Sequence, residues 1–196
     1  MDRENTKRIV VYGSRYGCTK RYAEHIAAAL GCAAVPAEEV RRGQLGGYNT
    51  VVFGGGAYAG SICGWKKIAR HCRAALRRAK GGGANGQRWV LFVCGLADPA
   101  KEKTRREARM LFDKRLPAEA AGTLPVFCLR GDLDYAVLGA KHRLMMRMLV
   151  AWLRRKKERT AEDKQLLASY GGAVRFFDAA SAAPVIAAAG GGDDGA

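Results

Sequence analysis

Short apolar runs alternate along this chain with longer stretches of helical periodicity. The apolar runs predict five buried strands, at residues 8–13, 32–36, 50–55, 89–95 and 126–131. The periodic stretches predict helices at residues 19–30, from Trp65 to just before the glycine cluster 81–83, at 103–115 and at 173–180. Strand and helix are therefore expected in regular alternation.

Such alternation is typical of a parallel sheet that is covered by helices on both faces. We expect an α/β fold with a doubly wound, five-stranded parallel sheet in the order 2-1-3-4-5, right-handed crossovers and a basic helical insertion after strand five. The length of 196 residues suits one domain. We assign residues 1–188 to that domain and expect the Gly- and Ala-rich residues 189–196 to form a disordered tail.

The formal net charge of +16 bears on the partners of the chain more than on its fold. Nucleic acid, an anionic membrane surface or an acidic small molecule would each be attracted. The sequence shows no secretory signal and no apolar stretch of the roughly 20 residues that span a bilayer. Six cysteines without CxxC or zinc-like spacing favour free thiols, no metal site and a cytoplasmic location.

The loop after the first predicted strand suits an anion. Its residues are Ser14, Arg15, Tyr16, Gly17, Cys18 and Thr19. The loop supplies two hydroxyls, a glycine for a tight turn and the amides of a helix start, all of which favour a phosphate group. Ligands of open α/β sheets bind at the carboxyl ends of the strands, next to the first strand. An ordinary polar turn between a strand and a helix is the alternative interpretation.

Two common nucleotide motifs do not fit this loop. It is not the GxGxxG pattern of dinucleotide sites, and it is not the GxxxxGK[ST] pattern of P-loop proteins. A dinucleotide and a nucleoside triphosphate are therefore both disfavoured as its ligand.

Four segments of the chain resemble the flavodoxin family. The first, YGSRYGCTKRYAEHIAAAL, is similar to the Ser/Thr-x-x-Gly-x-Thr loop that binds the FMN phosphate there. The others are VVFGGGAYAGSI, CGLADPAKEKTRREARMLF and GDLDY, the last followed by a basic, Met-rich helix. They resemble the corresponding segments of flavodoxin-type, menaquinone-dependent protoporphyrinogen IX dehydrogenases, where an Arg also occupies the position of Arg15. All four occur in the family's order.

The resemblance implies a flavodoxin-like fold, FMN as the cofactor and three FMN-binding loops. The implied FMN-binding residues are Ser14, Arg15, Tyr16, Gly17, Cys18, Thr19, Gly56, Ala57, Tyr58, Ala59, Gly60, Gly95, Leu96, Ala97 and Asp98. Tyr58 is the expected aromatic partner of the flavin ring, with a surface turn as the alternative. Flavodoxins usually carry a second aromatic residue in the third loop, but none occurs between Cys94 and Lys101.

The resemblance also implies an FMN-dependent oxidoreductase that oxidises protoporphyrinogen IX in haem biosynthesis and passes the electrons to a quinone. Positive charge near the flavin would favour its anionic hydroquinone, which suits substrate oxidation better than low-potential electron delivery. The flavin performs the bond chemistry, and no catalytic side chain is nominated. We expect His25, His71 and His142 to be solvated or packed on helices, and Cys18 to be a loop residue rather than a nucleophile.

Residues 138–157, LGAKHRLMMRMLVAWLRRKK, form a basic amphipathic segment. One helical face carries Leu138, Met145, Met148, Leu149 and Trp152. Such a helix suits the interface of an anionic membrane, and the same surface suits porphyrin propionates or a quinone. We therefore expect peripheral attachment to the inner face of the cell membrane. A core-packing helix with a solvated basic face is the alternative.

Two other classes of function compete with the enzyme. A flavodoxin-like electron-transfer protein would shuttle electrons between protein partners on the same fold and cofactor. A nucleic-acid binder is suggested by charge alone, because the chain lacks a recognition motif and an aromatic stacking platform. We expect no nucleic-acid partner.

Overall fold

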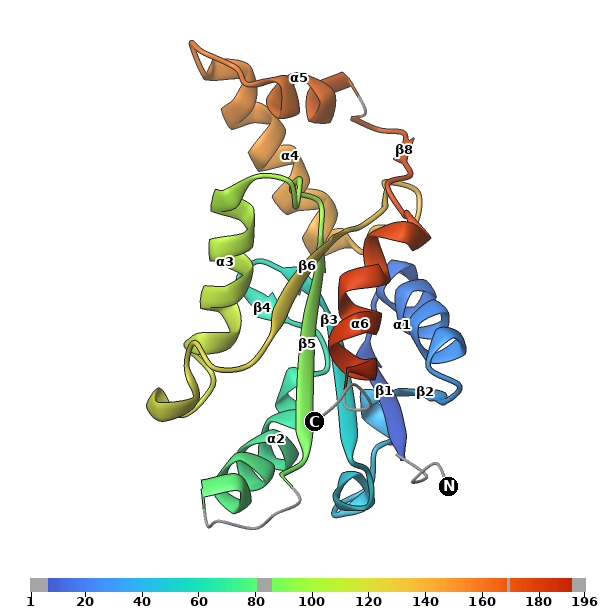
Figure 1. Ribbon diagram of the computed structural model, residues 1–196. Coiled ribbons are helices and arrows are strands. Elements are labelled where there is room, and N and C mark those ends of the chain that lie inside the picture. Colours follow the sequence, from blue (N-terminus) through green and yellow to red (C-terminus); the bar gives the residue numbers. More distant parts are fainter. Residues whose placement is uncertain (1–6, 81–85, 169, 192–196) are drawn as a thin grey trace.

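Five parallel strands form the centre of the protein. The structure, a computed structural model, describes residues 7–80, 86–168 and 170–191. The strands are β1 (Arg8–Gly13), β2 (Ala33–Pro36), β3 (Thr50–Tyr58), β5 (Arg88–Gly95) and β6 (Val126–Arg130). They pair in the order β2-β1-β3-β5-β6, which confirms the predicted order 2-1-3-4-5 (Figure 1). A further short strand, β4 (Ser61–Ile62), pairs antiparallel with the end of β3.

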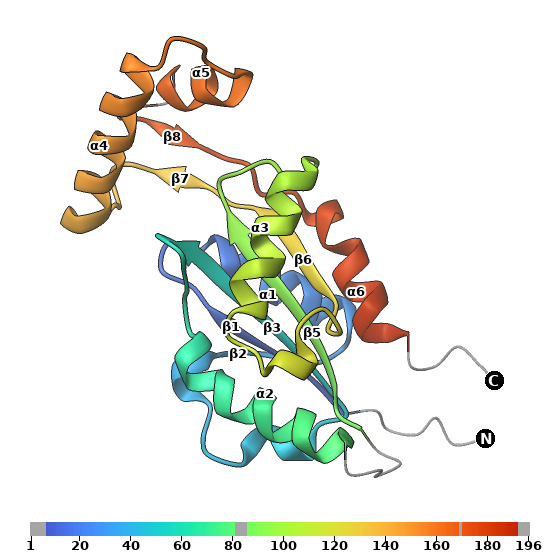
Figure 2. The ribbon, with the colours of Figure 1, turned by 90° about the vertical axis from the view of Figure 1, so that its left-hand side faces the viewer.

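Helices cover both faces of this sheet (Figures 1 and 2). On one face lie α1 (Cys18–Ala29) and α6 (Ala183–Gly190), and on the other lie α2 (Trp65–Lys80) and α3 (Glu102–Asp113). Alternate residues of each central strand point to opposite faces. In β5, for example, Val90 and Phe92 pack with α1 and α6, whereas Trp89 and Leu91 pack on the opposite side. Burial on both faces explains why the strands are continuous apolar runs in the sequence.

Short 3₁₀ turns complete the connections. They are η1 (Ala37–Glu39), η2 (Gln44–Gly47), η3 (Ala118–Ala120) and η4 (Ala179–Ala182). The predicted strands and the first three predicted helices are confirmed to within a few residues. The main exception is β3, which continues to Tyr58 instead of ending at Gly55 because β4 pairs with its final residues.

The prediction of a closing helix at residues 173–180 is wrong. Ala173–Val174 is instead strand β8, which pairs with β7 (Leu133–Asp134). The β-branched and aromatic composition of Val174, Phe176 and Phe177 favours extended backbone. The last helix, α6, begins only after η4, in which the Ala180 amide donates to the Asp178 carboxylate.

The tail was predicted to start at residue 189, which is too early in the sequence. Residues 189 and 190 belong to α6, and Ala189 is buried with an exposed fraction of 1%. Small side chains let α6 pack closely over β5, and so an Ala-rich sequence contributes to the core here. Residues 192–196 lie outside the described residues.

An insertion follows β6 and projects beyond the carboxyl ends of the strands (Figure 2). It consists of β7, α4 (Ala140–Arg155), α5 (Ala161–Ala168) and β8. A small apolar cluster built around Leu133, Tyr135 and Leu138 supports it. α4 covers most of the predicted basic segment, and it buries Val150 and Leu153. Within the described residues, no helix is long and apolar enough to cross a membrane.

The carboxylate of Asp132 fixes both ends of the insertion. One oxygen accepts hydrogen bonds from the amides of Phe176 and Phe177, at 2.7 and 2.9 Å. The other lies 2.9 Å from the guanidinium of Arg21 on α1. The side chain of Asp132 is only 8% exposed, so the pairing is shielded from most of the solvent. The chain therefore leaves the sheet and returns to it at one point.

Replacement of Gly54 by alanine should destabilise the fold. A Cβ atom at Gly54 would lie 1.9 Å from Cζ of Phe92, whose side chain is fully buried and cannot swing into solvent. We expect Gly54→Ala to lower the free energy of unfolding in urea by about 1–3 kcal/mol. Gly47→Ala is the control, because a Cβ there meets nothing within 4 Å, and it should change stability by less than about 0.5 kcal/mol. Equal stability of both variants would contradict this packing.

Candidate functional site

The predicted phosphate loop lies at the carboxyl end of β1 and leads directly into α1. Gly17 is the N-cap, with a left-handed φ of 90°. The hydroxyl of Ser14 accepts a hydrogen bond of 3.1 Å from the Gly17 amide and fixes the turn. Cys18 is the first residue of α1, so its expected place in the loop is wrong by one position.

The first turn of α1 presents amides to this loop. Its first intrahelical hydrogen bond joins the Arg21 amide to the Gly17 carbonyl. The amides of Cys18, Thr19 and Lys20 precede that bond and have no acceptor inside the helix. Amides in this position, at the positive end of a helix dipole, favour an anion.

Two glycines allow another segment to approach this loop closely. A Cβ atom at Gly13 would lie 2.1 Å from the carbonyl oxygen of Cys63. A Cβ atom at Gly64, where φ is 76°, would lie 2.9 Å from Cα of Gly13. The end of β1 is therefore locked against the chain that leads from β4 into α2.

The second predicted loop is a β-hairpin. Gly56, Ala57 and Tyr58 belong to β3, and only Ala59 and Gly60 form the turn. Both turn residues have positive φ, 48° and 74°, as a two-residue type I′ turn requires. The backbone of Gly56 packs against the Tyr58 ring, and a Cβ atom there would lie 2.7 Å from the ring. The hairpin thus holds Tyr58 firmly in place.

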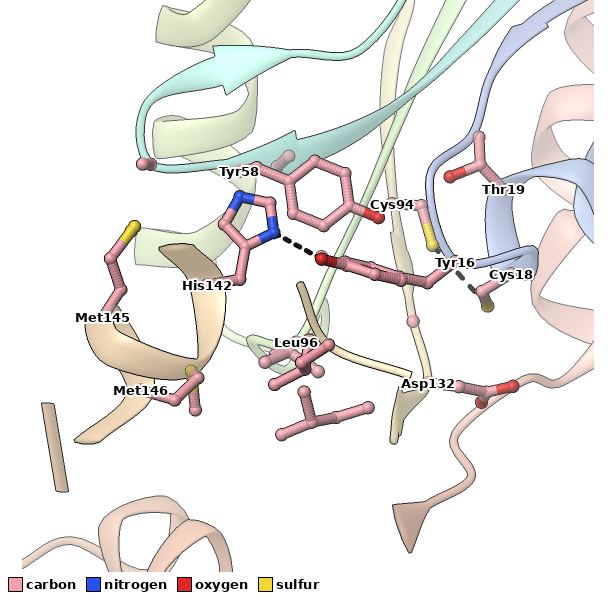
Figure 3. A pocket seen from close by; sticks show the side chains of 16 residues that line it. Tyr16, Cys18, Thr19, Tyr58, Cys94, Leu96, Asp132, His142, Met145 and Met146 are labelled. Carbon is pink, nitrogen blue, oxygen red and sulfur yellow. Dashed lines mark hydrogen bonds between the residues drawn. The ribbon is translucent and has the colours of Figure 1, made fainter. Parts of the chain in front are cut away.

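A cavity of about 190 Å³ lies where the predicted loops meet α4 (Figure 3). It is lined by Tyr16, Cys18, Thr19, Ala57, Tyr58, Ala59, Cys94, Gly95, Leu96, Gly131, Asp132, Leu133, Leu138, His142, Met145 and Met146. The three predicted loops therefore all contribute to one cavity at the carboxyl edge of the sheet.

Seven of the predicted residues do not line this cavity: Ser14, Arg15, Gly17, Gly56, Gly60, Ala97 and Asp98. Several of them have local structural contacts instead. The carbonyl of Gly60 accepts a hydrogen bond from Arg115, at 2.6 Å. Asp98 accepts from the Ala100 amide at 2.9 Å, and Ala97 lines a neighbouring cavity below the insertion.

Tyr16, Tyr58 and His142 form an aromatic cluster at the cavity (Figure 3). The rings of Tyr58 and His142 stack with centroids 5.2 Å apart and an interplanar angle of 15°. The Tyr16 ring lies edge-on to both, at 5.6 and 5.7 Å. Its hydroxyl lies 2.6 Å from Nδ1 of His142 and accepts a hydrogen bond of 3.3 Å from the Gly139 amide. The cluster therefore joins the phosphate loop, the hairpin and α4.

The surroundings of His142 and Tyr58 favour the neutral form of each ring. Partial desolvation, and after it the positive charges of Arg15 and Lys141, lower the pKa of His142. A neutral imidazole can accept a hydrogen bond from the Tyr16 hydroxyl at Nδ1. Burial raises the pKa of Tyr58 far above its ordinary value, so its phenol stays protonated.

The sequence analysis expected the surface of α4 to suit a porphyrin or a quinone, but it did not place His142 at the site. His142 was expected to be solvated or packed, yet it stacks on Tyr58 of the second predicted loop and lines the cavity. Met145 was noted only on the apolar face of an amphipathic helix, and Met146 was not singled out. Flavodoxins usually carry a second aromatic residue in the third loop, and this chain has none between Cys94 and Lys101. That absence was the one indication in the sequence that a second ring comes from another part of the chain.

These features fit FMN chemically. The amides at the start of α1 and the hydroxyls of Ser14 and Thr19 are a suitable donor set for a phosphate. The adjoining cavity is lined mostly by apolar and aromatic side chains, as a site for a flat ring system requires.

Comparisons with known proteins identify a matching family model and similar solved structures. A family model described as a flavodoxin domain matches residues 9–161. Among solved structures, Flavodoxin 2 from Bacillus cereus is 14% identical, with 91% of this chain and 98% of that chain covered and a TM-score of 0.44. The flavodoxin, WrbA-like protein from Agrobacterium tumefaciens is 19% identical, with 65% and 84% covered and a TM-score of 0.44. No curated protein matches the chain.

The match to the family model covers more than half of the chain and includes β1, the phosphate loop and all five parallel strands. FMN is the cofactor of that family. The chain belongs to the flavodoxin family and is a flavodoxin-like FMN protein with a redox role.

Proposed function

We propose that this protein is an FMN-dependent oxidoreductase that oxidises protoporphyrinogen IX, or a similar acidic porphyrinogen, and passes the electrons to a quinone. The observation that supports this most directly is the wall that α4 adds to the cavity. Met145 and Met146 on α4, with Leu138 just before the helix, make this wall apolar. Lys141 and Arg143 lie on α4, exposed to solvent. A flat, apolar molecule with carboxylate groups matches such a surface.

The cofactor would be held by the three segments that the sequence predicted. The amides of Thr19 and Lys20, with the hydroxyls of Ser14 and Thr19, would bind the phosphate. The hairpin from Gly56 to Gly60 and the segment from Gly95 to Asp98 would border the ring. Bound FMN supplies the acceptance of two electrons from a substrate and their release to an acceptor.

Tyr58 and His142 would border the flat part of the bound molecules. Their rings stack on each other with centroids 5.2 Å apart and so form one continuous aromatic surface of the cavity, and His142 comes from the insertion rather than from the third loop. The Tyr16 hydroxyl positions His142 through Nδ1, and it is positioned in turn by the Gly139 amide. His142 is thus placed to hold the substrate-side wall and to exclude water.

The positive charge of the chain supports oxidation of a substrate rather than delivery of electrons at low potential. The formal net charge is +16, and Arg15 and Lys141 both lie near His142 at the cavity. Positive charge favours a reduced, anionic flavin and raises the tendency of FMN to accept electrons. An electron carrier that delivers electrons at low potential would need the opposite charge.

One face of α4 remains exposed and supports contact with an anionic membrane. Leu144, Met148 and Trp152 are 56%, 58% and 59% exposed, although they are large and apolar. They recur at every fourth residue and therefore lie along one side of the helix. Arg147, Arg154 and Arg155 carry positive charge on the same helix. A quinone dissolved in the membrane would be within reach of such a protein.

Gly17 tests the phosphate loop. Gly17→Ala forces a side chain into a left-handed conformation, which costs about 1–2 kcal/mol and moves the amides of α1. We expect the dissociation constant for FMN, measured by quenching of flavin fluorescence, to rise by about tenfold or more.

Gly43→Ala is the matched control for Gly17→Ala. Gly43 has a similar φ of 82°, and a Cβ atom meets nothing within 4 Å at either position. The control should show a similar loss of stability but an FMN affinity within about twofold of the parent protein. FMN binding that is equally weakened in both variants would contradict the assignment of this loop.

Turnover tests the substrate. The FMN-loaded protein should convert protoporphyrinogen IX to fluorescent protoporphyrin IX and reduce a menaquinone analogue at the same time. Lys141→Glu should raise KM by at least about threefold, because it reverses charge near the cavity. Lys157→Glu, beyond the end of α4, should leave KM unchanged. Absence of turnover, with rapid electron exchange with a redox protein, would favour the electron-carrier alternative.

Liposome binding tests the exposed face of α4. We expect the triple variant Leu144→Ser, Met148→Ser and Trp152→Ser to lose at least about tenfold in affinity for anionic vesicles, because it removes the apolar surface that would insert. FMN binding should be unaffected, since none of the three lines the cavity. Met110→Ser on α3, which removes a side chain that is 51% exposed, is the control. Unchanged vesicle binding by the triple variant would reject the membrane contact.

A further inference from the structure

Two cysteines meet at the floor of the cavity. Sγ of Cys18, at the start of α1, lies 3.8 Å from Sγ of Cys94, near the end of β5 (Figure 3). They are 76 positions apart in the sequence and come from different elements. Both side chains are buried, and both line the cavity, so a small molecule that enters it can reach them.

We propose that Cys18 and Cys94 form a reversible disulfide that acts as a redox switch on the phosphate loop. The consequence for FMN rests on the proposed binding of its phosphate at this loop. The disulfide itself depends only on the two thiols and on access through the cavity.

The environment of the pair is asymmetric. Cys94 donates its S–H to the Cys18 sulfur, and this hydrogen bond is the main reason why the pKa of Cys18 is lowered. A hydrogen bond with the backbone of Asp132 also lowers the pKa of Cys18. The position of Cys18 at a helix N-terminus favours its thiolate further. Cys18 is therefore the attacking sulfur, and Cys94 is the resolving thiol.

The other four cysteines lack these features. Burial raises the pKa of Cys72 to about 12 and that of Cys128 to about 11. Burial also raises the pKa of Cys32 and of Cys63. None of these four lines the cavity. An oxidant in limited amount should therefore react at Cys18 first.

The chemistry balances with a peroxide as the oxidant. The Cys18 thiolate attacks one oxygen of hydrogen peroxide, the O–O bond breaks, and hydroxide leaves to give a sulfenic acid. The Cys94 sulfur then attacks the Cys18 sulfur, the S–O bond breaks, and the second oxygen leaves as water with the Cys94 proton. Two thiols and one peroxide thus give one disulfide and two waters. A dithiol reductant restores both thiols by exchange.

Closure of the disulfide is expected to move the loop. The two sulfurs need to approach from 3.8 Å to the bonded distance of about 2.05 Å. Cys94 is fixed in a central strand between Gly56 and Leu129. Cys18 follows Gly17, where an added Cβ atom would meet nothing within 4 Å. The start of α1 therefore shifts toward β5, and its amides leave the position that suits a phosphate.

The experiment uses the full chain freed of flavin. One equivalent of hydrogen peroxide should remove two of the six thiols, and peptide mapping without reduction should identify a Cys18–Cys94 link that dithiothreitol reverses. Cys94→Ser should instead leave a sulfenic acid at Cys18, which dimedone traps. Cys32→Ser is the matched control and should still form the link. Retention of all thiols, or oxidation at the other cysteines first, would overturn the proposal.

A second measurement separates the switch from the cofactor assignment. The oxidised protein should bind FMN at least about fivefold more weakly than the reduced protein, and Cys18→Ser should show no such difference after peroxide treatment. Equal affinity of the oxidised and reduced forms would refute the switch even if the disulfide forms. Failure of the reduced protein to bind FMN would contradict the proposed function, whereas the disulfide is scored without flavin.

Discussion

The close approach of two backbones at Gly13 determines where the site can form. The carbonyl of Cys63 occupies the space in which any side chain at Gly13 would lie, so β1 and the chain before α2 are locked together. The phosphate loop starts at this point, and the β3–β4 hairpin ends there. The same contact thus sets the distance between the amides at the start of α1 and the ring of Tyr58.

The sheet could be predicted because its strands are buried on both faces. Strands such as β1 and β5 are continuous apolar runs, and their alternation with periodic helices indicates parallel order. The closing helix could not be placed in the same way. The sequence around Val174 and Phe176 has strand character, while α6 consists of small residues that resemble a tail until their packing over β5 is known.

The site was predictable only where one segment carries its chemistry. Ser14, Gly17 and Thr19 are neighbours in the sequence, and their spacing alone indicates an anion. His142 and Tyr16 are 126 positions apart, and the pair of cysteines also depends on a long-range contact. Periodicity indicates which face of α4 is apolar, but it does not show that the helix folds back over the carboxyl ends of the strands.

The Asp132 carboxylate gives the insertion a narrow neck. The chain departs from the sheet beside this side chain and returns at Phe176 and Phe177, which donate to it. The insertion between Asp132 and Phe176 therefore starts and ends at the same point of the fold, and its length does not alter the spacing between β6 and α6. Evolution can therefore lengthen, shorten or exchange the insertion while the sheet stays the same. Related chains that keep the attachment at Asp132 can then differ in the molecules they accept.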